Sequence, residues 1–202
     1  RQLLDKWEIK TNTENNGESI LSDVAKAVDN KLAQEAISKD DVQGIGIGVP
    51  GPVDSQGVVH RCVNLGWGVV NVAEELGNLT GLTIKVGNDA NVAALGEMWQ
   101  GGAKGSKDVI MVTLGTGVGG GIIVDGKVVA GFNGAGGEIG HITVNHDEIE
   151  ACNCGQYGCL EQYTSATGIV RLAKRKLAKS SEETSIREIP NLTAKDVFDA
   201  AK

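Results

Sequence analysis

Aromatic residues, prolines and long apolar runs are all scarce in this sequence. Phe, Trp and Tyr make up 3% of the 202 residues, so a folded core has to consist of Val, Ile, Leu and Ala. Proline is scarce too, with 3 residues. No apolar run approaches the roughly 20 residues that a membrane-spanning helix requires. The first residues also lack the apolar stretch of a signal peptide, so we expect a cytoplasmic protein with no membrane partner.

The sequence also lacks an excess of positive charge. Its formal net charge of −7 argues against a nonspecific nucleic-acid surface, which needs clustered Lys and Arg. We therefore expect a nucleic-acid partner only if a helix-turn-helix precedes these residues. The first residue is not Met, and the last helical pattern stops without a C-cap, so we expect a piece of a longer protein.

Glycine, by contrast, is abundant, with 29 residues that cluster at the ends of apolar runs. Tight turns and close contacts between backbone and ligand need a residue without a Cβ at such places. The apolar runs 42–49, 82–86 and 108–114 predict buried strands, and alternation at 7–13 predicts another. Helical periodicity is present at 17–37. The pattern predicts an α/β protein with ligand loops built from glycine.

The cysteines Cys152, Cys154 and Cys159 predict a metal site. Three thiolates and one imidazole form a closed tetrahedral zinc site of the structural kind. His141 and His146 are the candidates for the fourth ligand, and His141 is favoured because it follows a glycine turn and leads into a strand. The alternative is a group of unrelated reduced thiols, which the compact Cys-x-Cys-Gly-x-x-Gly-Cys spacing disfavours.

A second glycine-rich segment, residues 115–121, follows the apolar run 108–114. It contains five glycines and Thr116, and bare backbone N–H groups in such a loop can face phosphate oxygens. It is not a Walker A loop, because no Gly-Lys-Ser/Thr follows. It is also a weak match to a dinucleotide fingerprint, because a hairpin follows instead of a helix. A glycine-rich β-turn without a ligand remains the alternative.

Asp89 stands at the end of a predicted strand, where α/β folds place ligands. Phosphoryl transfer to an alcohol needs an acceptor for the hydroxyl proton, and Asp89 is a candidate, with Asn88 binding a neighbouring hydroxyl. The alternative is that Asp89 caps the helix beginning near Ala90. The two roles do not exclude each other.

Three further polar residues, Asn64, Glu138 and Glu161, lie in predicted turns beside these motifs. Carboxylates and amides bind sugar hydroxyls in pairs. Each residue taken alone is more typical of a solvated or capping side chain. Their position next to the other motifs makes them candidates for a sugar site.

Together these motifs resemble one family. Residues 137–141 and 152–161 resemble the signature of the ROK family (repressors, unidentified reading frames and sugar kinases). The segments that resemble its other motifs, in the same order, are 49–53, 64–67, 88–91 and 114–121. Residues 165–169 look most like the glucokinase branch, and the resemblance extends from about Trp7 to the last residue.

The resemblance implies an actin-like, ribonuclease-H-like two-domain ATPase fold with a cleft between the domains. It implies a small α/β domain at 1–105 and a large α/β domain with the zinc loop at 106–202, both incomplete. It further implies a homodimer that transfers phosphate from ATP, with magnesium, to glucose, and that carries a structural zinc.

By the same resemblance, each candidate residue acquires an expected role. Asp89 matches the general base for the sugar 6-hydroxyl. The positions that match sugar contacts, besides Asp89, are Asn64, Asn88, Glu138, His141 and Glu161. The positions that match zinc ligands are His141, Cys152, Cys154 and Cys159. The positions that match the second phosphate loop are Gly115, Thr116, Gly117 and Gly119.

The sequence departs from the family pattern in one respect. The Asp-x-Gly-x-Thr hairpin that meets the ATP phosphates in family members is absent from these residues, as is the adenosine-binding stretch. We therefore expect a protein made of these residues alone to show no catalytic turnover. Two alternatives stay open, namely a kinase for another hexose or an N-acetylated amino sugar, and a sugar-sensing transcriptional repressor.

Overall fold

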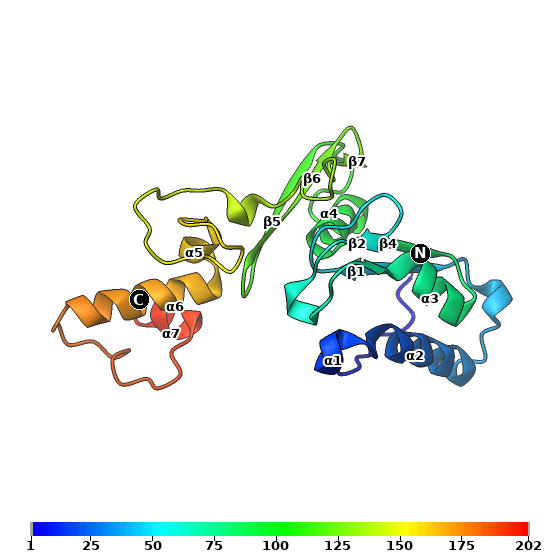
Figure 1. Cartoon of the computed structure of the whole chain (residues 1–202), viewed down its shortest axis with the longest axis horizontal. Coiled ribbons are helices and arrows are strands. Elements are labelled where there is room, and N and C mark those ends of the chain that lie inside the picture. The colour runs from blue at the N-terminus through cyan, green and yellow to red at the C-terminus, as the bar shows by residue number, and fades with distance from the viewer. Residues whose placement is uncertain (1, 202) are drawn as a thin grey trace. The chain divides into compact units, whose positions relative to one another are not determined.

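The computed structural model describes residues 2–201 and contains two compact units (Figure 1). The first comprises the residues up to 92 together with 130–136, and the second comprises 93–129 together with the residues from 137 onward. Each unit is described by itself. The division at residue 105 expected from the sequence concerns the domains of a complete protein and stays a prediction.

The first unit is built around two parallel strands, β1 and β4. β1 pairs with β4 in a register that runs from Ile45 opposite Ile84 to Val49 opposite Asn88. Two parallel strands require a long crossover connection. The crossover between β1 and β4 contains the short antiparallel pair β2–β3 and the helix α3. The elements in order are α1 (Glu14–Gly17), α2 (Ile20–Gln34), η1 (Lys39–Asp41), β1 (Ile45–Val49), β2 (Val58–Val59), η2 (Val63–Leu65), β3 (Val70–Asn71), α3 (Val72–Thr80) and β4 (Ile84–Asn88).

Helices α2 and α3 supply the core of this unit (Figure 1). Ala25 of α2 and Leu76 of α3 pack with Ile84 of β4 and are all buried. A second cluster joins α2 to the segment between β1 and α3, and its centre includes Val59 and Trp67. The sequence prediction of an aliphatic core is therefore confirmed, with Trp67 as its one aromatic member among the described residues of this unit.

The second unit contains an antiparallel three-stranded sheet and a group of helices. The strand order is β5-β6-β7, and β5 pairs with β6 from Val109 opposite Ile123 to Leu114 opposite Val118. Helix α4 begins at the end of β4 and leads into this unit. The elements are α4 (Asp89–Gln100), β5 (Val109–Leu114), β6 (Val118–Val124), β7 (Lys127–Val128), η3 (Ile139–His141), α5 (Glu161–Thr164), α6 (Ala166–Lys179) and α7 (Ala194–Asp199).

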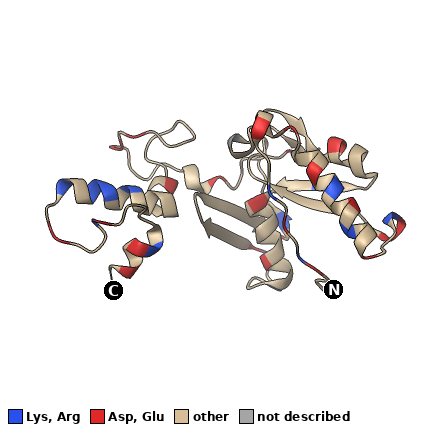
Figure 2. Cartoon of the chain, turned by 90° about the horizontal axis from the view of Figure 1, so that it is seen from below, with Lys and Arg blue, Asp and Glu red and all other residues tan. Residues whose placement is uncertain are grey.

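Helix α6 carries Lys and Arg residues along much of its length, as Figure 2 shows. It contacts α5 and α7. Helix α7 begins with a complete capping box, in which Thr193 accepts from the backbone of Asp196 and the Asp196 carboxylate accepts in return. Among the described residues no helix is both long and apolar enough to cross a membrane.

Two local predictions differ from the structure. Residues 7–13 form no strand, because alternation alone does not supply the hydrogen-bonded neighbour that a strand needs. The glycine loop predicted at 115–121 is also shorter, since β6 already begins at Val118. Gly120 is needed within this strand for packing: a Cβ there would lie 2.5 Å from the carbonyl oxygen of Gly137.

Candidate functional site

Asp89 lies at the junction of β4 and α4. It is exposed and is the first residue of α4, and its Oδ1 accepts from the N–H of Ala90 at 2.8 Å. The partial positive charge of the helix N-terminus favours an anion at this position. The structure therefore presents a solvent-accessible carboxylate at the end of β4.

Asn88, and not Asp89, makes the capping hydrogen bond of α4. Its Oδ1 accepts from the N–H of Asn91, three residues later, at 3.1 Å. Its Nδ2 donates to the carbonyl oxygen of Gly51 at 3.1 Å, so the amide also ties the end of β1 to that of β4. The capping role considered for Asp89 belongs mainly to its neighbour, which leaves most of the Asp89 carboxylate free.

Asn64 is exposed on the short helix η2. The residues that follow Asn64 pack against the segment that precedes α2. Trp67 Nε1 donates to the carbonyl oxygen of Gly17 at 3.2 Å, and a Cβ on Gly66, at φ +75°, would lie 3.0 Å from Cα of Asn16. This interlocking contact gives Asn64 a defined position on the first unit.

In the second unit, Glu138 directly precedes the short helix η3 and His141 is its last residue. Glycines allow η3 to lie directly on β6: a Cβ on Gly140 would lie 2.2 Å from the carbonyl oxygen of Val118. Glu138 precedes η3, and its Oε2 lies 3.9 Å from His141 Nε2. Both side chains are half-buried, so each keeps a surface that a ligand can reach.

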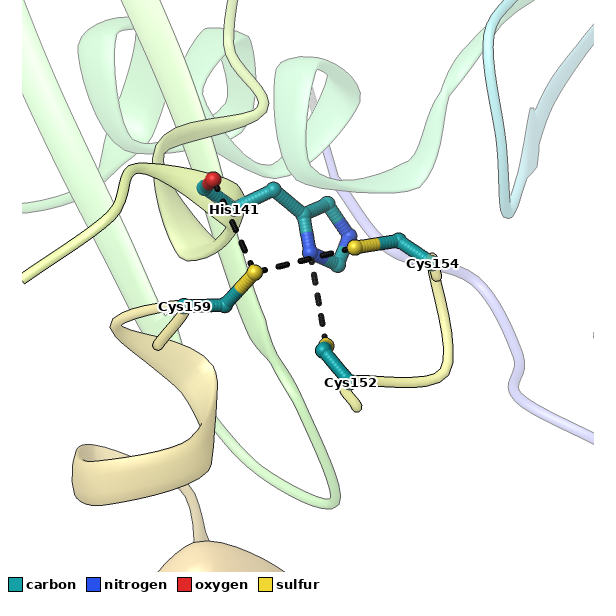
Figure 3. A group of neighbouring side chains, drawn as sticks. All are labelled: His141, Cys152, Cys154 and Cys159. Atoms are coloured by element: carbon teal, nitrogen blue, oxygen red, sulfur yellow. Dashed lines mark hydrogen bonds between the residues drawn. The ribbon is translucent and has the colours of Figure 1, made fainter. Parts of the chain in front are cut away.

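His141 and the three cysteines form one cluster (Figure 3). The four candidate ligand atoms lie within 4.8 Å of one another. Cys152 Sγ is 3.9 Å from His141 Nδ1, and Cys154 Sγ is 3.6 Å from Cys159 Sγ. Ligands at about 2.3 Å around a tetrahedral zinc ion lie about 3.5–3.8 Å apart. The donor set and its spacing therefore fit a structural zinc site.

The cluster resolves two questions left open by the sequence. His141 belongs to it and His146 does not, because residues 143 and 159 form a bridge that folds the segment back beside His141. The three thiols are brought together, which disfavours unrelated cysteines. Burial, followed by the neighbouring thiols of Cys154 and Cys152, raises the pKa of Cys159 to about 12. A metal ion would therefore have to displace protons to bind.

The glycine turn, here residues 115–117, connects β5 to β6. The N–H of Gly115 donates to the carbonyl oxygen of Gly117 at 3.0 Å, which closes the turn on itself. Within residues 2–201 the N–H groups of Thr116 and Gly117 have no hydrogen-bond acceptor. Gly119 lies outside the turn, in β6 opposite Thr113. The turn thus offers two free amides to an anion.

Glu161 is the first residue of α5 and approaches the glycine turn. Its Oε2 accepts from the N–H of Val118 at 2.9 Å, and its Oε1 lies 3.7 Å from Cys152 Sγ. A Cβ on Gly117 would lie 2.2 Å from the same Oε2, so a larger residue there would displace the Glu161 carboxylate. Glu161 therefore links the turn to the cysteine cluster within one unit.

Sequence reasoning missed the residues that hold the cysteine loop, defined here as residues 142–160. Glu148 is buried and accepts from Arg171, Arg175 and Tyr163 at 2.9, 3.0 and 2.6 Å. Arg171, followed by Tyr163, holds the pKa of Glu148 well below its usual range. Spacing could not reveal this cluster, because its cations lie more than twenty residues away on α6.

Gln162 was missed for the same reason. Its Oε1 accepts from the N–H of Cys159 at 3.1 Å, and its Nε2 donates to the carbonyl oxygen of Glu150 at 2.9 Å. One buried amide thus holds two parts of the cysteine loop without a metal ion. The only signal in the sequence is its place directly after Glu161.

Comparison with known proteins places these features in a family. The ROK family model matches residues 1–202. The chain belongs to the ROK family. A curated relative, the glucokinase of Halalkalibacterium halodurans, is 45% identical over 99% of this chain and 62% of its own length. The xylose repressor of Caldicellulosiruptor bescii is 35% identical over 80% of this chain and 41% of its own length.

A solved structure confirms the expected fold. The ROK family glucokinase of Streptomyces griseus, in complex with glucose and AMPPNP, superposes with a TM-score of 0.78 at 34% identity, over 99% of this chain and 64% of its own. The chain therefore has the actin-like, ribonuclease-H-like sugar-kinase fold. It spans about three fifths of the length of the curated glucokinases that it matches, 62% and 63% for two of them.

Proposed function

We propose that the complete protein transfers the γ-phosphoryl group of ATP to the 6-hydroxyl of glucose. The observation that carries this proposal is the 45% identity to a glucokinase across 99% of this chain, which includes Asp89 and the cysteine cluster. Free, exposed placement of the Asp89 carboxylate at the end of β4 supports it.

In this proposal Asp89 is the general base. The sugar O6 attacks the γ-phosphorus, the bond to the leaving ADP breaks, and the hydroxyl proton passes to the Asp89 carboxylate. Phosphoryl transfer needs little covalent help from the protein, so the proton acceptor and the positioning of the two substrates provide most of the catalysis.

We propose that Asn64, Asn88, Glu138, His141 and Glu161 each bind glucose hydroxyls. Asn88 already uses both its Oδ1 and one Nδ2 hydrogen within the protein, so it has one N–H left for a ligand. His141 faces the thiols with Nδ1, so its Nε2 side is left for the sugar. Each such bond contributes on the order of 1 kcal/mol.

The ATP phosphates are proposed to meet the glycine turn. The free N–H groups of Thr116 and Gly117 support direct contact, whereas Gly115 and Gly119 act through the shape of the turn and of β6. When bound, magnesium supplies positive charge that neutralises the developing charge on the phosphates.

We propose that His141, Cys152, Cys154 and Cys159 hold a structural zinc ion. When bound, zinc cross-links the cysteine loop to η3 and has no open coordination position for chemistry. The ion would fix the ring of His141 through Nδ1, which leaves Nε2 and the nearby Glu138 in a constant arrangement.

The first test is a coupled assay of the full-length protein with Mg-ATP, in which glucose is compared with mannose, fructose, N-acetylglucosamine and N-acetylmannosamine. Turnover much faster with glucose supports the proposal. Faster turnover of another sugar would make that sugar the substrate in the proposal, and Asp89 would remain the proposed base.

The second candidate function is that of a sugar-sensing repressor. The similarity to a xylose repressor over 80% of this chain favours it. Binding of a sugar without turnover of any sugar, together with a helix-turn-helix in the preceding sequence, would support this candidate over the kinase.

We further propose a homodimer in the cytoplasm. The free thiols of the cluster need a reducing compartment to remain available to a metal ion. Light scattering of the full-length protein tests the dimer, and fractionation of cells tests the location.

A further inference from the structure

The glycine turn is fastened to the α5–α6 junction, defined here as residues 161–167, by three hydrogen bonds. The N–H of Ala166 donates to the carbonyl oxygen of Gly115 at 2.9 Å. The hydroxyl of Thr167 donates to the carbonyl oxygen of Thr116 at 2.7 Å. Glu161 accepts from Val118 N–H on the other side of the turn at 2.9 Å. In Figure 1 the tip of the β5–β6 hairpin lies beside the start of α6.

Two of these bonds determine where the free amides of the turn point. In a planar trans peptide, the C=O of one residue and the N–H of the next point in opposite directions. The bond from Ala166 to the Gly115 carbonyl therefore directs the N–H of Thr116 away from the junction. The bond from Thr167 to the Thr116 carbonyl does the same for the N–H of Gly117.

The hydroxyl of Thr167 lies against Ser165. Ser165, the N-cap of α6, accepts from the N–H of Gly168 at 3.0 Å and donates to the carbonyl oxygen of Glu161 at 2.7 Å. Its Oγ lies 3.0 Å from Thr167 Oγ1. Because Ser165 is buried, this arrangement has few alternatives.

From this geometry we infer that Thr167 is a positioning residue for ATP: it fixes the Thr116–Gly117 peptide so that the N–H of Gly117 faces the phosphates. The inference rests on the proposed function, because it needs a phosphate ligand at the glycine turn. Thr167 acts through the backbone and does not touch the sugar residues of the site. Loss of its hydroxyl allows that peptide to rotate, which weakens binding of ATP but not of glucose.

The test uses the full-length protein and three variants. Thr167→Val removes the hydroxyl and keeps the side-chain shape. Thr167→Ser keeps the hydroxyl. Thr164→Val is the matched control, because the Thr164 hydroxyl donates only to the carbonyl oxygen of Leu160 within the neighbouring turn, at 3.1 Å. The measured quantities are KM for Mg-ATP, KM for glucose, kcat, the melting temperature, and the Kd of AMPPNP by calorimetry.

We expect Thr167→Val to raise KM for Mg-ATP and the Kd of AMPPNP about fivefold, which corresponds to ~1 kcal/mol for one hydrogen bond. KM for glucose should change less than twofold. Thr167→Ser should restore ATP binding, and Thr164→Val should leave it at the wild-type value.

Equal ATP affinity in Thr167→Val and Thr164→Val would overturn the inference, as would an equal rise in KM for both substrates. Calorimetry with AMPPNP separates failure of the inference about Thr167 from failure of the proposed function. A wild-type protein that binds AMPPNP but phosphorylates no sugar contradicts the kinase proposal while the AMPPNP comparison still decides the role of Thr167. A wild-type protein that binds no nucleotide overturns both.

Discussion

The junction of β4 with α4 and the cysteine loop each carry a carboxylate, and the surroundings of Asp89 and Glu148 differ completely. Asp89 is exposed, and within the described residues its only hydrogen bond comes from the N–H of Ala90. Glu148 has a side chain that is 1% exposed and accepts from Arg171, Arg175 and Tyr163. One carboxylate is therefore available to a ligand and the other is fully engaged by the protein.

The difference separates a site for chemistry from a structural support. A carboxylate that must accept a proton has to be accessible to the substrate, and its oxygens cannot all be engaged by cations of the protein. A carboxylate that anchors a loop does the opposite, because two guanidinium groups stabilise its charge and hold α6 against the loop. Asp89 is suited to the first role and Glu148 to the second, although only Asp89 stood out in the sequence.

The largest expected effect is that of Asp89→Asn in the full-length protein. Without a proton acceptor, kcat should fall by about 10²–10⁴, whereas KM for glucose and the melting temperature should change little. Steady-state kinetics and thermal unfolding measure both. Asp41→Asn, at an exposed carboxylate on η1 of the same unit, is the control. A kcat near that of wild type would remove Asp89 from the role of base.

Glu148→Gln should have the next largest effect, and on stability. It leaves Arg171 and Arg175 without their buried counter-charge, so we expect the free energy of unfolding to fall by about 3 kcal/mol. Urea denaturation measures this change. The control is Glu150→Gln, since Glu150 pairs with the same arginines but is 49% exposed and should cost at most about 1 kcal/mol. Equal losses in the two variants would contradict a special role of burial.

The same comparison has a pH dependence. The pKa of Glu148 lies below its usual 4.5 in the folded protein, so its contribution to stability is complete above pH 4.5 and is lost as the pH falls toward the folded pKa. Urea denaturation of wild type and Glu148→Gln should show a constant difference above about pH 5.5 and a shrinking one below about pH 4.5. A difference that is independent of pH down to pH 3 would show that the charge of Glu148 does not contribute.

Cys154→Ser should have a smaller effect on stability and a specific effect on metal content. Cys154 is exposed, so its side chain contributes little packing, and a fall in melting temperature of a few degrees has to come from the lost ion. Zinc content by atomic absorption should fall together with the melting temperature. In the control Cys62→Ala, a buried thiol outside the cluster, the melting temperature should fall while the zinc content stays constant. A constant metal-to-protein ratio in Cys154→Ser would end the zinc proposal.

Much of the local structure could be predicted from the sequence. Strands β1, β4 and β5 follow from the apolar runs 42–49, 82–86 and 108–114, and helix α2 follows from the helical periodicity at 17–37. The cysteine cluster could also be anticipated, because three thiols that are closely spaced in the sequence cannot lie far apart in the fold.

The predictions that were incomplete concern contacts between distant segments. The glycines at 119–121 looked like a loop, yet they lie in β6, where Gly120 makes room for Gly137. Asn88 looked like a ligand residue, yet its amide also caps α4 and binds Gly51. The sequence shows that a small or polar residue stands at such a place, but it does not show which distant segment contacts that residue.

The sequence by itself determined the residue types of the site: a carboxylate after a strand, a glycine turn, and one histidine near three thiols. Spacing is sufficient for these, since each motif is short and its geometry is local. Only the tertiary structure decided that His141 and not His146 joins the thiols, that Thr167 meets the Thr116 carbonyl of the glycine turn, and that Glu148 anchors the cysteine loop. The physical reason is that hydrogen bonds and close packing depend on which segments meet, and packing of the whole unit brings them together.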